Sequence, residues 1–171
     1  MSLNINIANS CNIIVVRGKR YNPSSTQADL TIENVDSGFT YSTAMAYDSG
    51  TGNGEINIPV DNLDAGYGVF KITVEEGGQT YATLPILIKC DIDCCLAKLT
   101  NELVDCSCDC PRCAKSLAKA QKVFLLLQSA ISQVDLASYN TTVNASVYYT
   151  EMLEKYKKAR EICDDSCGCD C

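Results

Sequence analysis

The sequence predicts an α+β fold, with a β-sandwich in the first half and helices in the second. Apolar and polar residues alternate through residues 1–89, which is typical of half-buried strands. Near Cys90 the apolar spacing changes to that of a helix. We therefore expect a β-sandwich-like domain over residues 1–89 and a cysteine-rich helical domain over residues 90–171, which suits a chain of 171 residues.

The strands of the first half are short and regularly spaced. Ile5 and Ile7 alternate with asparagines, residues 13–16 form a β-branched run, and Leu30 and Ile32 again alternate with polar residues. Segments rich in Gly, Ser and Asn separate these runs and indicate turns. Roughly six or seven strands at this spacing predict an immunoglobulin-like β-sandwich, with a small barrel as the competing architecture.

The clearest hairpin lies at the end of the first half. Residues 69–74 and 80–88 flank a short turn that contains Gly77 and Gly78, which supply the positive φ angles that tight hairpins need. Pro85 has no backbone N–H to donate to a neighbouring strand. Its strand is therefore expected at a sheet edge or at a bulge.

Three helices are expected in the second half. The first is short and follows Asp93 as a cap, and a cysteine-containing loop then spans residues 105–112. Longer helices over about residues 113–134 and 141–162 should pack as an antiparallel hairpin. Core packing is expected for the apolar faces Cys95, Leu96, Leu99 and Leu103; Leu117, Phe124 and Ile131; Ala120, Leu127 and Val134; and Tyr149, Met152, Tyr156 and Ala159.

Cysteine is the most distinctive residue of the chain, with 12 copies, 11 of them in the helical half. The antiparallel hairpin would bring eight together at one end: Cys106, Cys108, Cys110, Cys113, Cys163, Cys167, Cys169 and Cys171. Cys90, Cys94 and Cys95 are expected roughly 15 Å or more from that cluster. Cys11 is expected to be a buried small apolar residue.

Three chemistries fit eight clustered thiols. Zinc takes four thiolates, so eight cysteines match two closed sites, and the absence of histidine makes such sites all-cysteine or completed by a carboxylate. Disulfides across the hairpin are the close alternative, and an iron–sulfur cluster is a third option. Either zinc or disulfides would staple the open end of a hairpin whose core is small.

Charge and composition exclude several classes of protein. A net charge of −7 disfavours nucleic acid and anionic membrane surfaces as partners. The N-terminus lacks the basic and apolar regions of a signal peptide, and the apolar runs are too short to span a bilayer. Synthesis in a reducing cytoplasm is therefore expected.

No catalytic centre is recognisable in the sequence. The chain has no histidine for a Ser–His or Cys–His pair, no phosphate-binding loop and no dinucleotide fingerprint. Cys110-Pro-Arg-Cys113 has the spacing of a redox motif, but it lies among other cysteines and lacks a preceding strand. We expect a protein that is not an enzyme.

Two segments of the helical half resemble parts of known proteins. These are Asp-Cys-Cys-Leu-Ala-Lys-Leu at residues 93–99 and Ala-Gln-Lys-Val-Phe-Leu-Leu-Leu at residues 120–127. They resemble segments in structural proteins of tailed bacteriophages, which also often carry immunoglobulin-like modules. The resemblance covers about the last 80 residues of the chain. It implies a virion component of the neck, tail or capsid surface that is made in the host cytoplasm.

The leading hypothesis is a structural or adaptor protein of a virion, whose partners are other structural proteins and copies of itself. The alternative is a cytosolic zinc- or thiol-stabilised interaction or regulatory module, and a redox or metal-handling protein comes third. Fold alone does not decide among these classes. Association with phage particles separates the first class from the other two.

Overall fold

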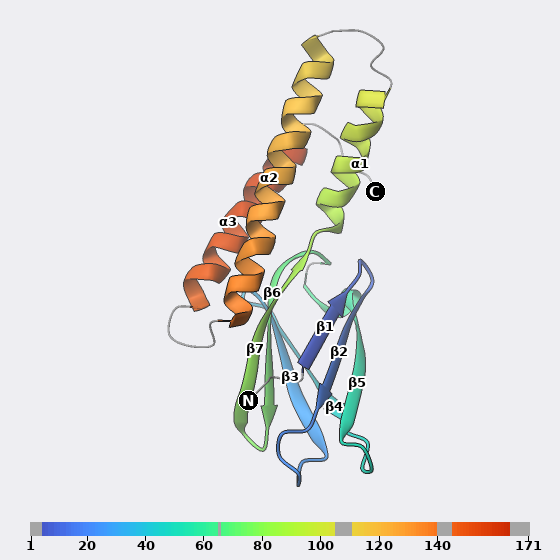
Figure 1. Ribbon diagram of the computed structural model, residues 1–171, viewed down its shortest axis with the longest axis vertical. Helices are drawn as coiled ribbons and strands as arrows, with labels where there is room; N and C mark the ends of the chain where they lie inside the picture. The colour runs from blue at the N-terminus through green and yellow to red at the C-terminus, as the bar shows by residue number, and fades with distance from the viewer. Residues whose placement is uncertain (1–4, 65, 105–110, 140–144, 165–171) are drawn as a thin grey trace.

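The computed structural model describes residues 5–64, 66–104, 111–139 and 145–164. The described chain is elongated, with two antiparallel β-sheets at one end and a layer of three helices at the other (Figure 1). Strands end at Ile88 and the first helix begins at Cys90. The predicted α+β class and the change from strand to helix near Cys90 are therefore confirmed.

In the part of the chain that the structure describes, seven strands form the two sheets. The smaller sheet has the order β1-β2-β5, and the larger has the order β4-β3-β6-β7. All neighbouring strands pair antiparallel. The strand bounds are Ile5–Asn9 (β1), Ile13–Lys19 (β2), Gln27–Asn34 (β3), Thr40–Ala46 (β4), Asn53–Pro59 (β5), Gly68–Glu76 (β6) and Gln79–Ile88 (β7), and a 3₁₀ turn, η1, spans Val60–Asn62.

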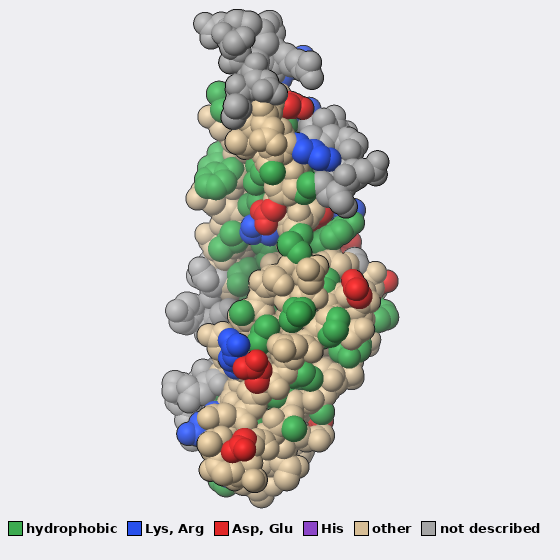
Figure 2. Space-filling model, turned by 90° about the vertical axis from the view of Figure 1, so that its right-hand side faces the viewer, with side chains coloured by type: hydrophobic (Ala, Val, Ile, Leu, Met, Phe, Trp, Pro, Cys, Tyr) green, Lys and Arg blue, Asp and Glu red, His purple; other side chains and the backbone are tan. Residues whose placement is uncertain are grey.

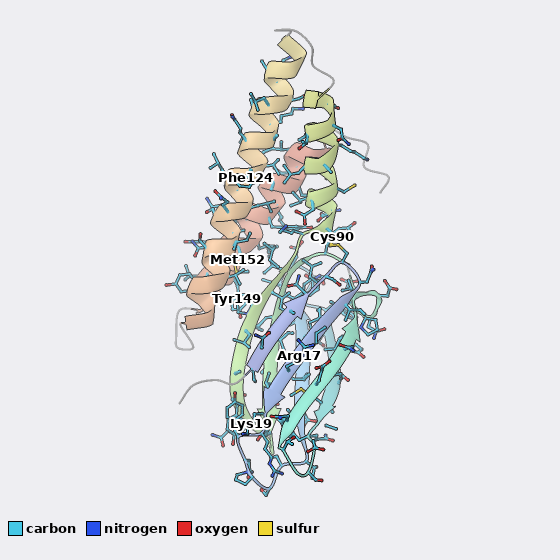
Figure 3. The ribbon with its side chains drawn as sticks, turned by 45° about the vertical axis from the view of Figure 1, so that its right-hand side comes forward. Arg17, Lys19, Cys90, Phe124, Tyr149 and Met152 are labelled. Carbon is cyan, nitrogen blue, oxygen red and sulfur yellow. A yellow bond between two sulfur atoms is a disulfide. The ribbon has the colours of Figure 1, made fainter. Side chains whose placement is uncertain are left out.

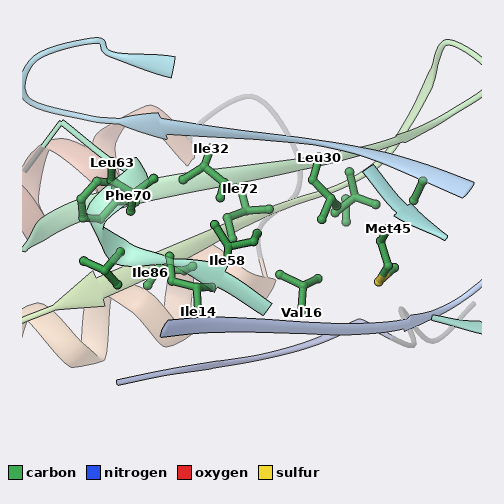
Figure 4. Packing of buried hydrophobic residues seen from close by; sticks show 14 of the residues in the cluster. Ile14, Val16, Leu30, Ile32, Met45, Ile58, Leu63, Phe70, Ile72 and Ile86 are labelled. Atoms are coloured by element: carbon green, nitrogen blue, oxygen red, sulfur yellow. The ribbon is translucent and has the colours of Figure 1, made fainter. Parts of the chain in front are cut away.

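The core of the sandwich lies between the two sheets, where side chains from both inner faces meet (Figure 4). Ile14 and Val16 of β2 and Ile58 of β5 face Leu30, Ile32, Phe70 and Ile72 of the larger sheet, and all seven are at most 1% exposed. Within each strand these residues are two apart, as the sequence alternation predicts. The alternation of apolar and polar residues in the first half therefore marks the side chains that are buried between the two sheets.

The β6–β7 hairpin forms as its glycines predict. The strands pair from Glu76 and Gln79 outward, and the two residues between them, Gly77 and Gly78, have φ angles of 57° and 79°. Two consecutive positive φ angles match the twist of the flanking strands in a two-residue turn, and glycine adopts them without strain. This turn sets the pairing of Glu76 and Glu75, and an irregularity between Glu75 and Val74 then shifts the register by one residue along the rest of the hairpin.

Strand β7 lies at the edge of its sheet, as Pro85 predicts. Strand β1 is the edge of the other sheet, and the Asn9 side-chain Nδ2 donates a 3.1 Å hydrogen bond to the Leu87 carbonyl of β7. One side of the sandwich is therefore closed by a contact between the edge strands β1 and β7.

The helices are α1 (Cys90–Val104), α2 (Pro111–Tyr139) and α3 (Ala145–Asp164). Helices α2 and α3 lie side by side and run in opposite directions, with their lower ends against β6 and β7 (Figure 1). No described helix combines the length and apolarity that crossing a membrane requires.

The helical layer has its own buried core, which extends onto the larger sheet. Val69 of β6 and Leu87 of β7, a cross-strand pair, are buried in the same apolar cluster as Leu99, Val123 and Met152. Their neighbours along the strands face the sandwich core instead. This end of the sheet is buried on both faces, which explains the unbroken apolar run at residues 86–88.

Among the described residues, three of the four predicted helical stripes are buried or half-buried, and the fourth is exposed. Tyr149, Met152, Tyr156 and Ala159 of α3 are buried, and Leu127 of α2 is too. Core burial of Leu117, Phe124 and Ile131 was a wrong prediction, because these side chains are 46%, 53% and 42% exposed. Helix α2 packs against its neighbours along one face, so the second heptad row faces away from the core.

A buried carboxylate ties the loop after β2 to the β6–β7 hairpin. Glu76 is 2% exposed. Its carboxylate accepts hydrogen bonds from the Tyr47 hydroxyl at 2.6 Å and from the backbone N–H groups of Asn22 at 2.9 Å and Tyr21 at 3.2 Å. Burial by itself would raise the pKa of Glu76, but these donors outweigh it and hold the pKa below its ordinary value.

Replacing Glu76 with glutamine is expected to flatten the acid side of the stability profile. A carboxylate whose pKa is lowered by folding stabilises the fold above its unfolded pKa, and that stabilisation is lost as the pH falls through the folded pKa. Urea unfolding between pH 7 and pH 3 should show a steeper loss below about pH 5 in the natural chain than in E76Q. At pH 7, E76Q should be less stable by about 1–3 kcal/mol. Identical acid limbs for the two proteins would contradict this role.

Candidate functional site

Among the described residues, disulfides and a buried polar cluster lie at the junction between strands and helices. Cys11, in the turn between β1 and β2, forms a disulfide with Cys90, the first residue of α1, with 5.7 Å between the Cα atoms. Figure 3 shows Cys90 where the strands meet the helices. The bond crosses 79 positions of sequence and ties the turn of the smaller sheet to the start of the helical layer.

A second disulfide lies inside the helical core. Cys95 of α1 and Cys163 of α3 are bonded, with 5.8 Å between their Cα atoms, and they are 0% and 3% exposed. Both Cα separations fall in the usual range for disulfides. The first bond therefore joins the sandwich to α1, and the second joins α1 to α3.

A polar cluster lies beside these bonds. The Tyr156 hydroxyl of α3 donates a 2.7 Å hydrogen bond to the Asp91 carboxylate of α1. Arg160 approaches the same carboxylate at 3.8 Å and lies 4.9 Å from the centre of the Tyr67 ring, just before β6. Burial raises the pKa of Asp91 and also that of Tyr156. The cluster connects α1, α3 and the larger sheet in one polar contact.

An ion pair on the surface adds a further link between helix and strand. Lys157 of α3 pairs with Asp36 in the turn after β3. Both side chains are about half exposed, at 49% and 52%, so the pair contributes little free energy by itself. The pair is a second contact between α3 and the larger sheet, in addition to the contact between Arg160 and Tyr67.

The structure corrects two expectations about the cysteines. Cys11 is exposed and disulfide-bonded, so its prediction as a buried apolar residue was wrong. Cys95 was expected roughly 15 Å or more from Cys163, yet the two are bonded. Helix α2 has 29 residues and α3 has 20, so α3 ends roughly 13 Å short of the start of α2 and instead reaches α1.

Most of the predicted eight-cysteine cluster lies outside the described residues. This holds for Cys106, Cys108, Cys110, Cys167, Cys169 and Cys171, and the side chain of Cys113 is not described either. Among described residues, no group of three or more potential metal ligands is present. The five cysteines whose side chains are described, namely Cys11, Cys90, Cys94, Cys95 and Cys163, are all disulfide-bonded.

A shallow groove of about 650 Å³ crosses the outer face of the smaller sheet, where Figure 3 labels Arg17 and Lys19. Its central contact is a 2.7 Å ion pair between Arg17 and Glu55, both more than half exposed. Solvated groups of this kind lack the desolvation that tunes catalytic residues. The groove therefore provides no argument for catalysis.

The face of the molecule seen in Figure 2 carries few charged side chains, and positive and negative groups are mixed on it. It has no continuous basic surface of the kind that binds nucleic acid. This agrees with the acidic net charge of −7.

The sequence matches no family model. A comparison with curated proteins likewise finds no significant match. The interpretation of function therefore depends on the geometry of this chain.

The junction was not found by sequence reasoning, although its residues carried a signal. Cys11 lies in a short polar turn between two strands, and Cys90 stands where the last strand gives way to a helix. Two cysteines at the ends of adjacent elements are candidates for a disulfide. Which of the many possible partners each would take could not be derived from spacing.

Proposed function

We propose that this chain is a non-enzymatic structural or adaptor protein of a phage virion, associated with the neck, tail or capsid. The observation that carries the proposal is the strand-to-helix junction. Two disulfides and the Asp91–Tyr156 hydrogen bond fasten the sandwich, α1 and α3 to one another. Such fastening suits a part that transmits or withstands force, whereas a catalyst needs convergent reactive groups.

The redox state of the cysteines supports this role. Disulfides persist in oxidising surroundings and are rare in the cytosol, where thiols are kept reduced. A virion component is made in the host cytoplasm and then released into an oxidising medium. Its disulfides would close after assembly, so the finished particle would be more stable than the newly made chain.

The strand order supports an immunoglobulin-like interpretation of the sandwich. The first, second and fifth strands form one sheet, and the third, sixth and seventh are neighbours in the other. Constant-type immunoglobulin domains have the same neighbours and place the fourth strand beside the fifth. Here β4 instead pairs with β3, so the proposed likeness is to a variant of that architecture.

For the remaining cysteines we propose disulfides in preference to zinc. The five described cysteine side chains are all in disulfides, including Cys163 of the predicted eight-residue set. A sulfur in a disulfide is no thiolate and cannot ligate zinc. Zinc held by Cys106, Cys108, Cys110 and Cys113 is the competing proposal, and an elemental analysis of the purified chain separates the two.

The experiment that tests the proposed function is detection of the chain in purified phage particles. Phage particles whose genome encodes this chain are banded on a density gradient. Peptides of the chain are then measured across the gradient fractions by mass spectrometry. The chain should peak with the major capsid protein and stay there after a second gradient. A chain found only in the soluble fraction would favour the cytosolic interaction module instead.

A further inference from the structure

Helix α2 exposes a row of large apolar side chains along its outer face. Leu117, Phe124 and Ile131 are 46%, 53% and 42% exposed, and each is seven residues from the next. Phe124 lies on α2 further from the sandwich than Tyr149 and Met152 of α3 (Figure 3). Single exposed apolar residues are ordinary on protein surfaces, but a row at heptad spacing is not.

Two exposed glutamines complete the pattern. Gln121 and Gln128 stand between the apolar residues, so steps of four and three residues alternate from Leu117 to Ile131. This alternation is the seam of a left-handed helix pair, in which such positions fit between the side chains of a facing helix. We call these five residues the α2 seam, and it is about 21 Å long at ~1.5 Å per residue.

The α2 seam contains no charged residue. The exposed cations Lys115 and Lys122 project from roughly the opposite side of the helix, at about 100° per residue. A contact between identical copies places the same patch on both sides, so charges of one sign within it would repel. In a chain of net charge −7, an uncharged seam lets a second copy approach without repulsion between like charges at the contact.

Apolar surface continues beyond the lower end of the seam. A groove of about 200 Å³ lies between α2 and the edge strands. Its lining is mainly apolar, with Ile7, Pro85, Ile86, Leu87, Ile131 and Val134, and also includes Asn9 and Lys89, whose ammonium pairs with Asp93. A helix laid along the α2 seam would extend over this groove. The groove adds apolar area next to the last residue of the seam.

We propose that the α2 seam is the contact between two copies of this chain, with Phe124 at its centre. The proposal deepens the structural role proposed above by naming the surface through which copies meet. One helix seam and a small groove offer less than the ~800 Å² per partner of a standard stable interface. The dimer is therefore weak and concentration-dependent, as suits a contact that assembly reinforces.

The test is sedimentation equilibrium of the oxidised full-length chain at concentrations from micromolar to several hundred micromolar. The average mass should rise from one chain toward two. Phe124→Glu should weaken dimerisation at least tenfold, because two carboxylates would meet at the centre of the contact. Phe124→Leu, which keeps an apolar side chain, should retain the dimer.

Leu125→Glu is the matched control, because Leu125 is 64% exposed but lies roughly 100° around the helix from Phe124. It introduces the same charge and should leave dimerisation unchanged. A natural chain that stays monomeric throughout, or equal weakening by the two glutamates, would overturn the proposal. Circular dichroism of each variant confirms that its fold is kept.

The outcomes for this proposal and for the virion role are distinguishable. A monomer that nevertheless bands with particles overturns the α2 seam and leaves the virion role standing. A dimer that Phe124→Glu dissociates, but which is missing from particles, supports the seam and overturns the virion role. The two experiments share no readout.

Discussion

Replacing Cys95 and Cys163 together with alanine is expected to lower the free energy of unfolding by about 4 kcal/mol. The bond closes a loop between cysteines 68 positions apart, and losing it restores that freedom to the unfolded chain. Because both sulfurs are buried in the helical core, the substitution also removes apolar packing. Urea unfolding without reductant, followed by circular dichroism, measures the loss.

The matched control for this prediction is the double variant Cys11→Ala with Cys90→Ala. Its loop is similar, with a separation of 79, but Cys11 is exposed and Cys90 is only partly buried against the sandwich core, so less core packing is lost. It should be less destabilised than the Cys95–Cys163 variant. Unfolding of the natural chain at the same urea concentration with and without reductant would contradict the role given to both bonds.

Phe70→Ala is expected to lower the free energy of unfolding by about 3–5 kcal/mol, a large share of the ~5–15 kcal/mol that is typical of a folded domain. Phe70 of β6 is 0% exposed between the two sheets, where Ile32 and Ile72 belong to the same cluster. Truncating it leaves a cavity that the rigid sandwich cannot fill. Thermal unfolding measured by calorimetry, with loss of the strand signal in circular dichroism, reports the effect.

Phe124→Ala supplies the comparison for this core substitution. It removes the same atoms from a side chain that is 53% exposed, so the change in stability should be within about 0.5 kcal/mol at low protein concentration. Similar losses of stability on truncating Phe70 and Phe124 would contradict the burial of Phe70 and the exposure of Phe124. The comparison thus tests the difference between the sandwich core and the α2 seam.

The sandwich was predictable because its signals are local. Alternation places Ile14, Val16, Leu30 and Ile32 on inner faces, and two adjacent glycines fix the last hairpin. Pro85 marks an edge strand because proline cannot donate to a neighbour. Each of these inferences needs only a few neighbouring residues and a rule of backbone geometry.

The helical half was harder because its packing depends on distant elements. Both heptad rows of α2 look like core in the sequence, but only the row with Leu127 meets α3 and the sheet, and the row with Phe124 does not. The spacing of apolar residues along a helix identifies an apolar face, but it does not show whether another element of the fold covers that face.

Cysteine pairing failed for a related reason. Cys163 was expected near the start of α2, but the shorter α3 lies lower against the sheet and brings Cys163 to Cys95. The predicted helices over residues 113–134 and 141–162 are equally long and gave no offset, whereas α2 has 29 residues and α3 has 20. Sequence spacing limits the possible pairs without choosing among them.

A disulfide map of the full-length chain tests the fastened junction between strands and helices most directly. The protein is alkylated without reduction, digested, and analysed by mass spectrometry, with zinc content measured on the same sample. We expect peptides that link Cys11 to Cys90 and Cys95 to Cys163, with no stoichiometric zinc. Alkylated Cys11, Cys90, Cys95 and Cys163, or thiols protected until a chelator is added, would contradict this expectation.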